Sequence, residues 1–230
     1  GKRRRNRQTS FGFAPHGGAR RGSGRKPQGR VASVTHLPRP HLSGREPVLV
    51  TMKFERSLPS VRSQFAFRLI LRSLACARDR FGMRVVEFSV QRDHIHLLVE
   101  AASSAALTRA MQGLAVRLAR ALNRRLKRRG KVFEERYHGR VLATPRQVRN
   151  ALAYVLCNGR KHGHAPLGAS GWLDPFSSAR SFDGWKGRSD AGAMRARDET
   201  TSAARTWLLR IGWRRAGLLS TAHAPGAMPV

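Results

Sequence analysis

Two segments with the composition of β-strands, residues 84–90 and 94–100, are separated by only three residues. A connection this short predicts that the two strands form an antiparallel hairpin. In the second strand Ile95, Leu97 and Val99 share one face, because side chains alternate along a strand. That face must meet a hydrophobic layer, so the hairpin is expected to form the centre of a sheet that helices cover.

The segments around this hairpin indicate how the sheet is completed. Two more are extended, residues 47–54 and 131–144, and three have helical periodicity, residues 60–80, 103–129 and 145–162. The order β-α-β-β-α-β-α predicts the α+β fold class, with a ferredoxin-like, split βαβ antiparallel sheet followed by one additional helix.

Charge indicates the class of partner. The chain of 230 residues has 45 Lys and Arg against 13 Asp and Glu, a net charge of +32. An excess of this size predicts a polyanionic partner. Nucleic acid is favoured over an anionic membrane surface, because no long amphipathic helix has a Lys-rich polar face.

Composition divides the chain into three parts. Residues 1–46 predict a basic, disordered arm, since residues 1–45 contain 12 Lys and Arg, no acidic residue and little apolar surface to offset the entropy of ordering. A central domain is expected over residues 47–163. Residues 164–230 are expected to form a C-terminal extension with a short basic helix over residues 203–216 and a disordered end.

The sequence gives no sign of export or membrane insertion. No stretch approaches the roughly 18 apolar residues that a membrane helix needs, and the basic N-terminal residues do not lead into an apolar secretory segment. Cys76 and Cys157 are far apart without a neighbouring cysteine, so neither a disulfide framework nor a cysteine zinc site is expected. These features predict a cytoplasmic protein.

Two histidines and one tyrosine are the candidates for chemistry. His94 and His96 are two residues apart on a strand, so both imidazoles project from one face, as in many metal sites. The pair alone fits ordinary surface histidines equally well. On the helix over residues 145–162, Tyr154 falls opposite the apolar stripe, with Asn158 one turn further along. Packing of the tyrosine ring against the sheet is the alternative.

These residues belong to motifs that occur in a fixed order: H-I-H at 94–96, R-Y-H-G-R-V-L at 136–142 and P-R-Q-V-R-N-A-L-A-Y-V-L-C-N-G-R-K-H at 145–162. Together they resemble the single-tyrosine HUH transposases, and most closely the REP-associated tyrosine transposases of bacteria. The likeness spans about residues 25–213. Its specific element is an H-x-H pair followed by Y-x-x-x-N on a later helix.

The resemblance implies a role for each candidate. His94, His96 and Asn158 are expected to bind one divalent ion, Mg²⁺ or Mn²⁺, and Tyr154 to be the catalytic nucleophile on the additional helix. The implied activity is a metal-dependent single-stranded DNA endonuclease and strand transferase that forms a covalent 5′-phosphotyrosine. The implied substrate is single-stranded DNA bearing a hairpin like a repetitive extragenic palindrome, and the implied location is the bacterial nucleoid.

Basic residues are the candidates for DNA contact. Arg136 and Arg140 flank the last strand, and Lys161 shares the helix face of Tyr154. Four more candidates end the second helix: Arg124, Arg125, Arg128 and Arg129. Affinity from these groups is expected to fall with salt, because phosphate contacts release counterions.

Several residues have alternative interpretations. Glu100 shares the histidine face and is a candidate carboxylate behind the metal ligands. Tyr137 is a possible second nucleophile, with packing or stacking favoured. Phe88, Trp172 and Trp185 are candidate base-stacking residues, with core packing favoured.

Two other functions compete with the transposase. The first is a non-catalytic nucleic-acid binding protein on the same fold, which is disfavoured because histidines replace the stacking aromatics that such sheets carry. The second is another HUH nuclease, a relaxase or replication initiator, although those often carry a third histidine. The sequence leaves open whether the protein is a monomer or a homodimer.

Overall fold

The structure is a computed structural model that describes residues 41–169, 171–187 and 200–224. The predicted N-terminal arm lies outside the described residues up to position 40. Residues 41–46 belong to the described part, where Leu42 is buried and its N–H donates to Ser104 Oγ at 2.9 Å.

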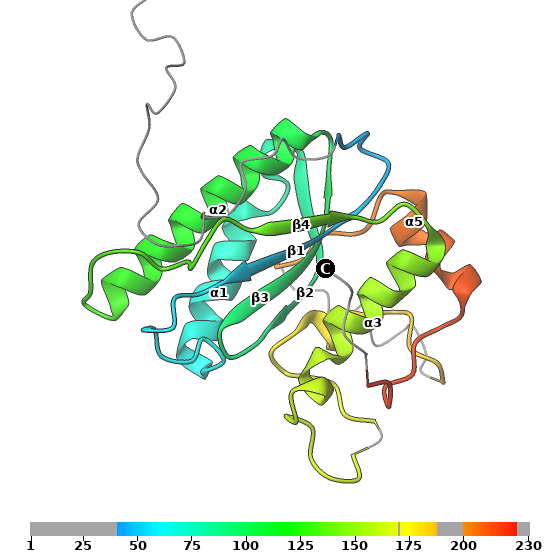
Figure 1. Ribbon diagram of the computed structural model, residues 1–230. Helices are drawn as coiled ribbons and strands as arrows, with labels where there is room; N and C mark the ends of the chain where they lie inside the picture. The colour runs from blue at the N-terminus through cyan, green and yellow to red at the C-terminus, as the bar shows by residue number, and fades with distance from the viewer. Residues whose placement is uncertain (1–40, 170, 188–199, 225–230) are drawn as a thin grey trace, which may run out of the picture. The chain divides into compact units, whose positions relative to one another are not determined.

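Four antiparallel strands form one sheet in the order β2-β3-β1-β4 (Figure 1). They span Val48–Lys53 (β1), Met83–Val90 (β2), His94–Ala101 (β3) and His138–Val141 (β4). A helix joins β1 to β2 and another joins β3 to β4, while β2 and β3 form the predicted hairpin. The predicted ferredoxin-like α+β fold is therefore confirmed.

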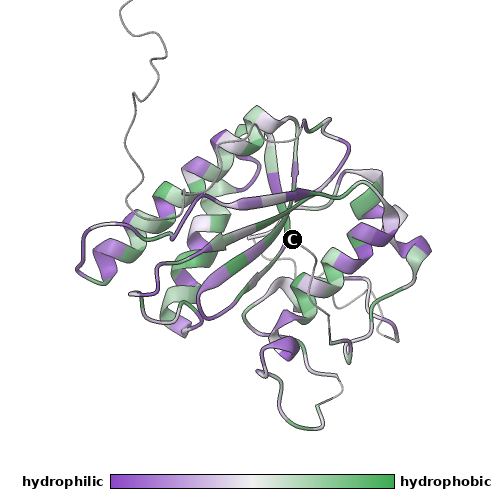
Figure 2. Ribbon diagram, viewed as in Figure 1, coloured by the Kyte–Doolittle hydropathy of each residue, from purple (hydrophilic) through white to green (hydrophobic). Residues whose placement is uncertain are grey.

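Helices cover the sheet on both faces, as Figure 1 shows. Helices α1 (Gln64–Ala77) and α2 (Ser104–Arg125) pack together on one face. Helix α3 (Pro145–Lys161) lies on the other face with the C-terminal segment, which contains the short helix α5 (Trp207–Arg210). Apolar and hydrophilic residues alternate along α1 and α2 in Figure 2, the pattern of amphipathic helices with one buried side.

Strand β3 separates the two cores. Ile95, Leu97 and Val99 belong to the core under α1 and α2, whereas Leu98 belongs to the core under α3. The face predicted to meet helices therefore does so, and the histidine face is covered as well.

Some helix ends differ from the prediction for local reasons. Ser63 Oγ accepts the N–H of Ala66 and so caps α1, which begins at Gln64 rather than at residue 60. Helix α2 ends at Arg125 rather than at residue 129, because Lys127 has a φ of 49°, in the left-handed region that a helix cannot continue through.

The predicted helix over residues 203–216 is wrong in extent. Only Trp207–Arg210 is α-helical, and a 3₁₀ helix follows at Gly212–Ala216. The buried carboxylate of Glu100 accepts the backbone N–H groups of Arg205 and Thr206 at 2.8–3.0 Å. These bonds hold the chain extended up to Thr206, whose side chain then caps α5.

Helix α3 is fixed at both ends. At its start, Thr144 and Gln147 form a reciprocal capping box behind Pro145. Near its end, Gly159 leaves room for Asp174, since a Cβ at position 159 would overlap the Asp174 carboxylate. Asp174 in turn forms a buried, bidentate ion pair with Arg62, with N–O distances of 2.7 and 3.0 Å.

Replacing Asp174 by Ala should strongly destabilise the fold, because it leaves the Arg62 guanidinium buried without its counter-charge. The expected loss in the free energy of unfolding is about 3–5 kcal/mol, measured by urea denaturation. Asp183→Ala is the matched control: Asp183 pairs with Arg214 at 3.0 Å, but both side chains are about a third exposed, so the loss should stay below about 1 kcal/mol. Equal losses in the two variants would contradict the structural role of the Arg62–Asp174 pair.

Candidate active site

His94 and His96 project from β3 toward the α3 side of the sheet, and hydrogen bonds hold both rings through Nδ1. The atom Thr51 Oγ1, on the facing residue of β1, is 3.0 Å from His96 Nδ1. Asp93 Oδ1 is 2.8 Å from His94 Nδ1. The two rings meet edge to face, with centroids 4.6 Å apart. With Nδ1 engaged on each ring, Nε2 is the nitrogen that remains for a ligand.

Tyr154 of α3 lies beside this pair. Its half-buried ring meets the His96 ring edge to face, with centroids 4.8 Å apart. The ammonium of Lys161 lies 5.2 Å from the centroid of the tyrosine ring. The structure thus brings together the two predicted histidines, the predicted nucleophile and the predicted lysine.

Asn158 is located between these contacts. One turn before it, Tyr154 touches His96, and one turn after it, the His162 ring lies 5.7 Å from the His94 ring. The side chain of Asn158 therefore faces the imidazole pair. It is completely buried, and within the described part of the chain neither of its amide atoms has a hydrogen-bond partner. The polar arc of α3 is thus covered by the sheet at Asn158, rather than facing water.

The electrostatics of the site follow from burial. Desolvation holds the pKa of His96 well below 6.5, and His94, His162 and Lys161 lower it further. His96 is therefore neutral at physiological pH, which is the form that binds metals. Burial also raises the pKa of Tyr154 above its usual 10, so the free site favours the protonated phenol.

The donor set fits a divalent ion. His96 Nε2 and Asn158 Oδ1 are buried atoms that have no hydrogen-bond partner among the described residues, and such orphaned groups carry a large desolvation cost unless a ligand satisfies them. No group of three or more His, Cys, Asp or Glu side chains in the described ranges is arranged to hold a metal. The predicted set contains only two residues of those types and takes its third donor from the Asn158 carboxamide.

Sequence reasoning missed the residues that support the histidines. Asp93 had a visible signal, because it directly precedes His94. Thr51 had none, because its place beside His96 depends on the pairing of β1 with β3. Ser89 of β2 and Gln91, the residue after β2, were missed for the same reason.

Two candidate residues have other roles. Glu100 does not lie behind the histidines. It is two residues beyond Leu98 on β3, and its carboxylate binds Arg84 and the backbone of the C-terminal segment. Tyr137 packs against the core under α1 and α2, on the opposite side of the sheet from His96. The interpretation of Tyr137 as a second nucleophile is therefore wrong, because the sheet separates it from the histidines.

The predicted DNA-contacting arginines lie in two regions. Arg140 faces Leu49 across the β1–β4 ladder and so lies on the α3 side, with Arg136 exposed just before β4. The others lie at the end of α2, on the α1–α2 layer: Arg124, Arg125, Arg128 and Arg129. In that group the Arg125 guanidinium lies 4.6 Å from the centre of the Phe65 ring, and Arg128 donates to the Lys131 carbonyl. The α2 group is therefore separated from Tyr154 by the sheet.

The candidate stacking residues mostly serve the cores. Phe88 and Trp185 are buried, and the Trp185 indole N–H donates to the Ala179 carbonyl at 2.9 Å. Trp172 is half-buried, with the Arg160 guanidinium over its ring. Cys157 is buried and its pKa is raised to about 11, so it is a packing residue.

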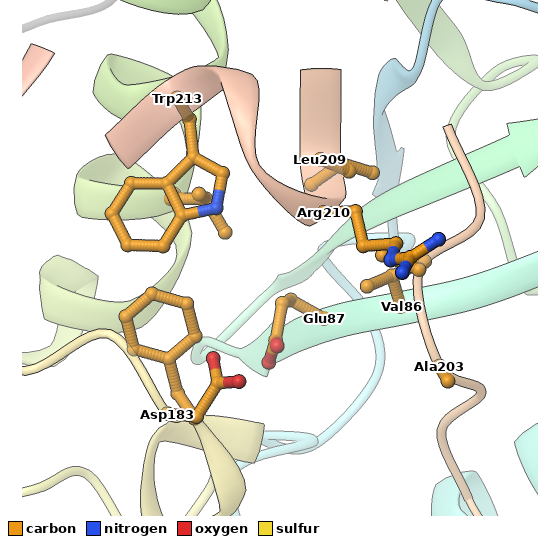
Figure 3. A pocket seen from close by; sticks show the side chains of 10 residues that line it. Val86, Glu87, Asp183, Ala203, Leu209, Arg210 and Trp213 are labelled. Atoms are coloured by element: carbon orange, nitrogen blue, oxygen red, sulfur yellow. The ribbon is translucent and has the colours of Figure 1, made fainter. Parts of the chain in front are cut away.

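A separate cavity of about 170 Å³ lies between β2, α3 and the C-terminal segment (Figure 3). Glu87, Asp183, Arg210 and Trp213 are among its lining residues. None of the sequence-predicted site residues lines it.

The described helices include none that is both long enough and apolar enough to cross a membrane.

Comparison with known protein families indicates a DNA-processing role of the transposase class. Residues 53–155, which contain both histidines and Tyr154, match the family described as "Transposase IS200 like". The family predicted from the sequence motifs is thereby confirmed. No curated protein matches the chain.

The fold is also similar to a solved structure. That structure is described as the REP-associated tyrosine transposase bound to a REP hairpin. The similarity has a TM-score of 0.52 at 13% sequence identity and covers 63% of this chain and 82% of the other. At this identity the comparison establishes the fold.

Replacing Asn158 by Leu should stabilise the metal-free protein, because an apolar side chain of similar size removes two unpaired buried polar atoms. We expect the free energy of unfolding in EDTA to rise by about 1 kcal/mol, and stabilisation by added Mn²⁺ to be lost. Asn150→Leu, at an exposed position of the same helix, should keep the Mn²⁺ effect. Destabilisation of Asn158→Leu in EDTA would mean that the amide already has a partner within the protein.

Proposed function

We propose that this chain is a metal-dependent, single-stranded DNA endonuclease and strand transferase that acts on hairpin-bearing DNA through a covalent 5′-phosphotyrosine. The observation that carries the proposal is the contact of Tyr154 with His96, beside a buried Asn158 amide that has no hydrogen-bond partner among the described residues. A tyrosine packed only for stability would not need polar groups left unsatisfied next to it.

Tyr154 supplies the nucleophile. Its phenolic oxygen forms a bond to the phosphorus of the scissile phosphodiester, and the bond from phosphorus to the 3′ oxygen breaks. The phenol loses one proton and the leaving 3′ oxygen gains one, so the step is balanced. The energy of the phosphodiester is kept in the phosphotyrosine bond, so a 3′-hydroxyl can attack it and rejoin DNA without ATP.

Lys161 prepares Tyr154 for this attack. Because burial raises the pKa of Tyr154, the phenolate needs positive charge nearby when the proton leaves. The Lys161 ammonium, beside the tyrosine ring, supplies part of it and can also hold a phosphate oxygen. Phosphoryl transfer depends chiefly on such positioning and charge stabilisation.

His94, His96 and Asn158 are the residues that would hold the divalent ion, Mg²⁺ or Mn²⁺. When bound, the ion polarises the scissile phosphate as a Lewis acid, and its neutral ligands leave its charge uncompensated. Asp93 and Thr51 orient the two imidazoles for this task through their Nδ1 atoms.

Single-stranded DNA with a hairpin is the proposed substrate. The net charge of +32 favours a polyanion, and the similar transposase structure is bound to a REP hairpin. An association with the bacterial nucleoid and a monomeric or homodimeric state belong to the same proposal. A non-catalytic binding protein is disfavoured, because α3 covers the sheet face that such proteins use for stacking bases.

The central test is the covalent adduct. Wild type, incubated with Mn²⁺ and a labelled single strand containing a hairpin, should form a slower-migrating, protease-sensitive species on a denaturing gel. Tyr154→Phe should form none, because it lacks the attacking oxygen. The chain has only two tyrosines, so Tyr137→Phe is the matched control and should react like wild type. An adduct of equal amount in Tyr154→Phe would refute the assignment of the nucleophile.

The arginines at the end of α2 should contribute to affinity but not to chemistry, because the sheet separates them from Tyr154. For Arg124→Gln/Arg125→Gln, the slope of log affinity against log salt should fall by about 1.4 if each residue neutralises one phosphate of a single strand. The adduct rate at saturating DNA should equal that of wild type. Arg78→Gln/Arg80→Gln, an exposed pair beyond the end of α1, controls for lost charge alone. A slower adduct rate at unchanged affinity would contradict this division of roles.

A further inference from the structure

Gln91 lies in the same region, and the proposed function gives this residue no role. Its side chain is 1% exposed, and within the described residues neither its Oε1 nor its Nε2 has a hydrogen-bond partner. Burying an amide without hydrogen-bond partners opposes folding. An apolar residue would avoid that cost, so the amide needs an explanation.

The position of Gln91 connects it to the histidines. Its backbone N–H donates to the His94 carbonyl at 2.8 Å, which closes the β2–β3 hairpin. Directly facing residues of an antiparallel pair project to the same side, with Cβ atoms about 5 Å apart. Gln91 therefore stands next to His94 on the face that meets α3, just as Ser89 stands next to His96.

The segment that follows α3 keeps Gln91 buried. The segment that follows α3 runs along the edge of β2, where Val90 N–H donates to the Phe176 carbonyl at 2.8 Å and Ser89 bridges to Ser177. The Arg62–Asp174 ion pair anchors this segment. The amide of Gln91 is thus buried rather than turned out to water.

Some of the orphaned polar atoms of the described residues lie in this region, and others lie around the end of α2, at Asn123 and Arg128. Four residues on the inner side of β2, β3 and α3 share the property, in the described part of the chain, of a buried side-chain atom without a hydrogen-bond partner: Ser89, Gln91, His96 and Asn158. What distinguishes this group is its chemistry: imidazole, hydroxyl and amide groups on one side of the sheet are side chains suited to bind a ligand.

We propose that Gln91 is a further metal ligand of this site, binding the divalent ion through Oε1. The inference rests on the proposed function. A bound cation would satisfy the orphaned oxygen of the amide, and a phosphate oxygen of the DNA would satisfy the nitrogen. Amide oxygens suit Mg²⁺ and Mn²⁺.

The test measures Mn²⁺ affinity by electron paramagnetic resonance, without DNA and without a catalytic assay. Gln91→Met removes the amide but keeps the shape of the side chain, and should weaken Mn²⁺ binding at least about tenfold. Gln91→Glu places a carboxylate on the ion and should restore or tighten binding. Gln112→Met, an exposed position on α2, should bind like wild type. Circular dichroism establishes that each variant is folded.

The outcomes separate this inference from the proposed function. Wild-type affinity in folded Gln91→Met, with wild type binding Mn²⁺ and His96→Ala not, would overturn the role of Gln91 and leave the proposed function intact. Absence of Mn²⁺ binding in wild type would overturn both. Weak binding in Gln91→Met together with recovery in Gln91→Glu supports the ligand role, since a purely structural glutamine would not produce opposite effects in the two variants.

Discussion

The two-residue period of β3 is the constraint on which the rest of the structure depends. Ile95, Leu97 and Val99 commit one face of the strand to the core under α1 and α2. The same alternation forces His94, His96 and Leu98 to the other face. A shift of one residue in register would exchange the two sets, so the hydrophobic core that stabilises the sheet also fixes where the imidazoles point.

Helix α3 completes the site, and burying its polar groups lowers the stability of the fold. Its apolar residues pack on Leu49 and Leu98, while Tyr154 and Asn158 meet the polar end of the same face. Burying unpaired amides and an imidazole nitrogen opposes folding. Several buried polar contacts elsewhere offset this, among them the Arg62–Asp174 pair and the bonds from Glu100 to the C-terminal segment. Buried polar groups that lack hydrogen-bond partners are typical of places where a protein binds a ligand or catalyses a reaction.

The sequence predicted the order of the elements, the ferredoxin-like topology and the place of His94, His96 and Tyr154, because these depend on periodicity and on motifs local in the chain. It failed where the answer depends on contacts between distant segments. The burial of Asn158 follows from the sheet that covers it, and the role of Glu100 from a segment more than a hundred residues away. The helix expected over residues 203–216 has the right composition, but those bonds to Glu100 override its propensity. The position of Gln91 required the closed hairpin to be seen.

The close passage of Asp174 over Gly159 has a consequence for how the chain can be divided. A fragment ending after α3 would contain every residue that we place at the site. It would lack the segment that seals the edge of β2, the counter-charge of Arg62 and the indole of Trp213 packed beside α3. Such a fragment would contain all the reactive groups, but it would lack the contacts that fix the orientation of α3. The minimal unit that preserves their spacing is therefore longer than the stretch that bears the motifs.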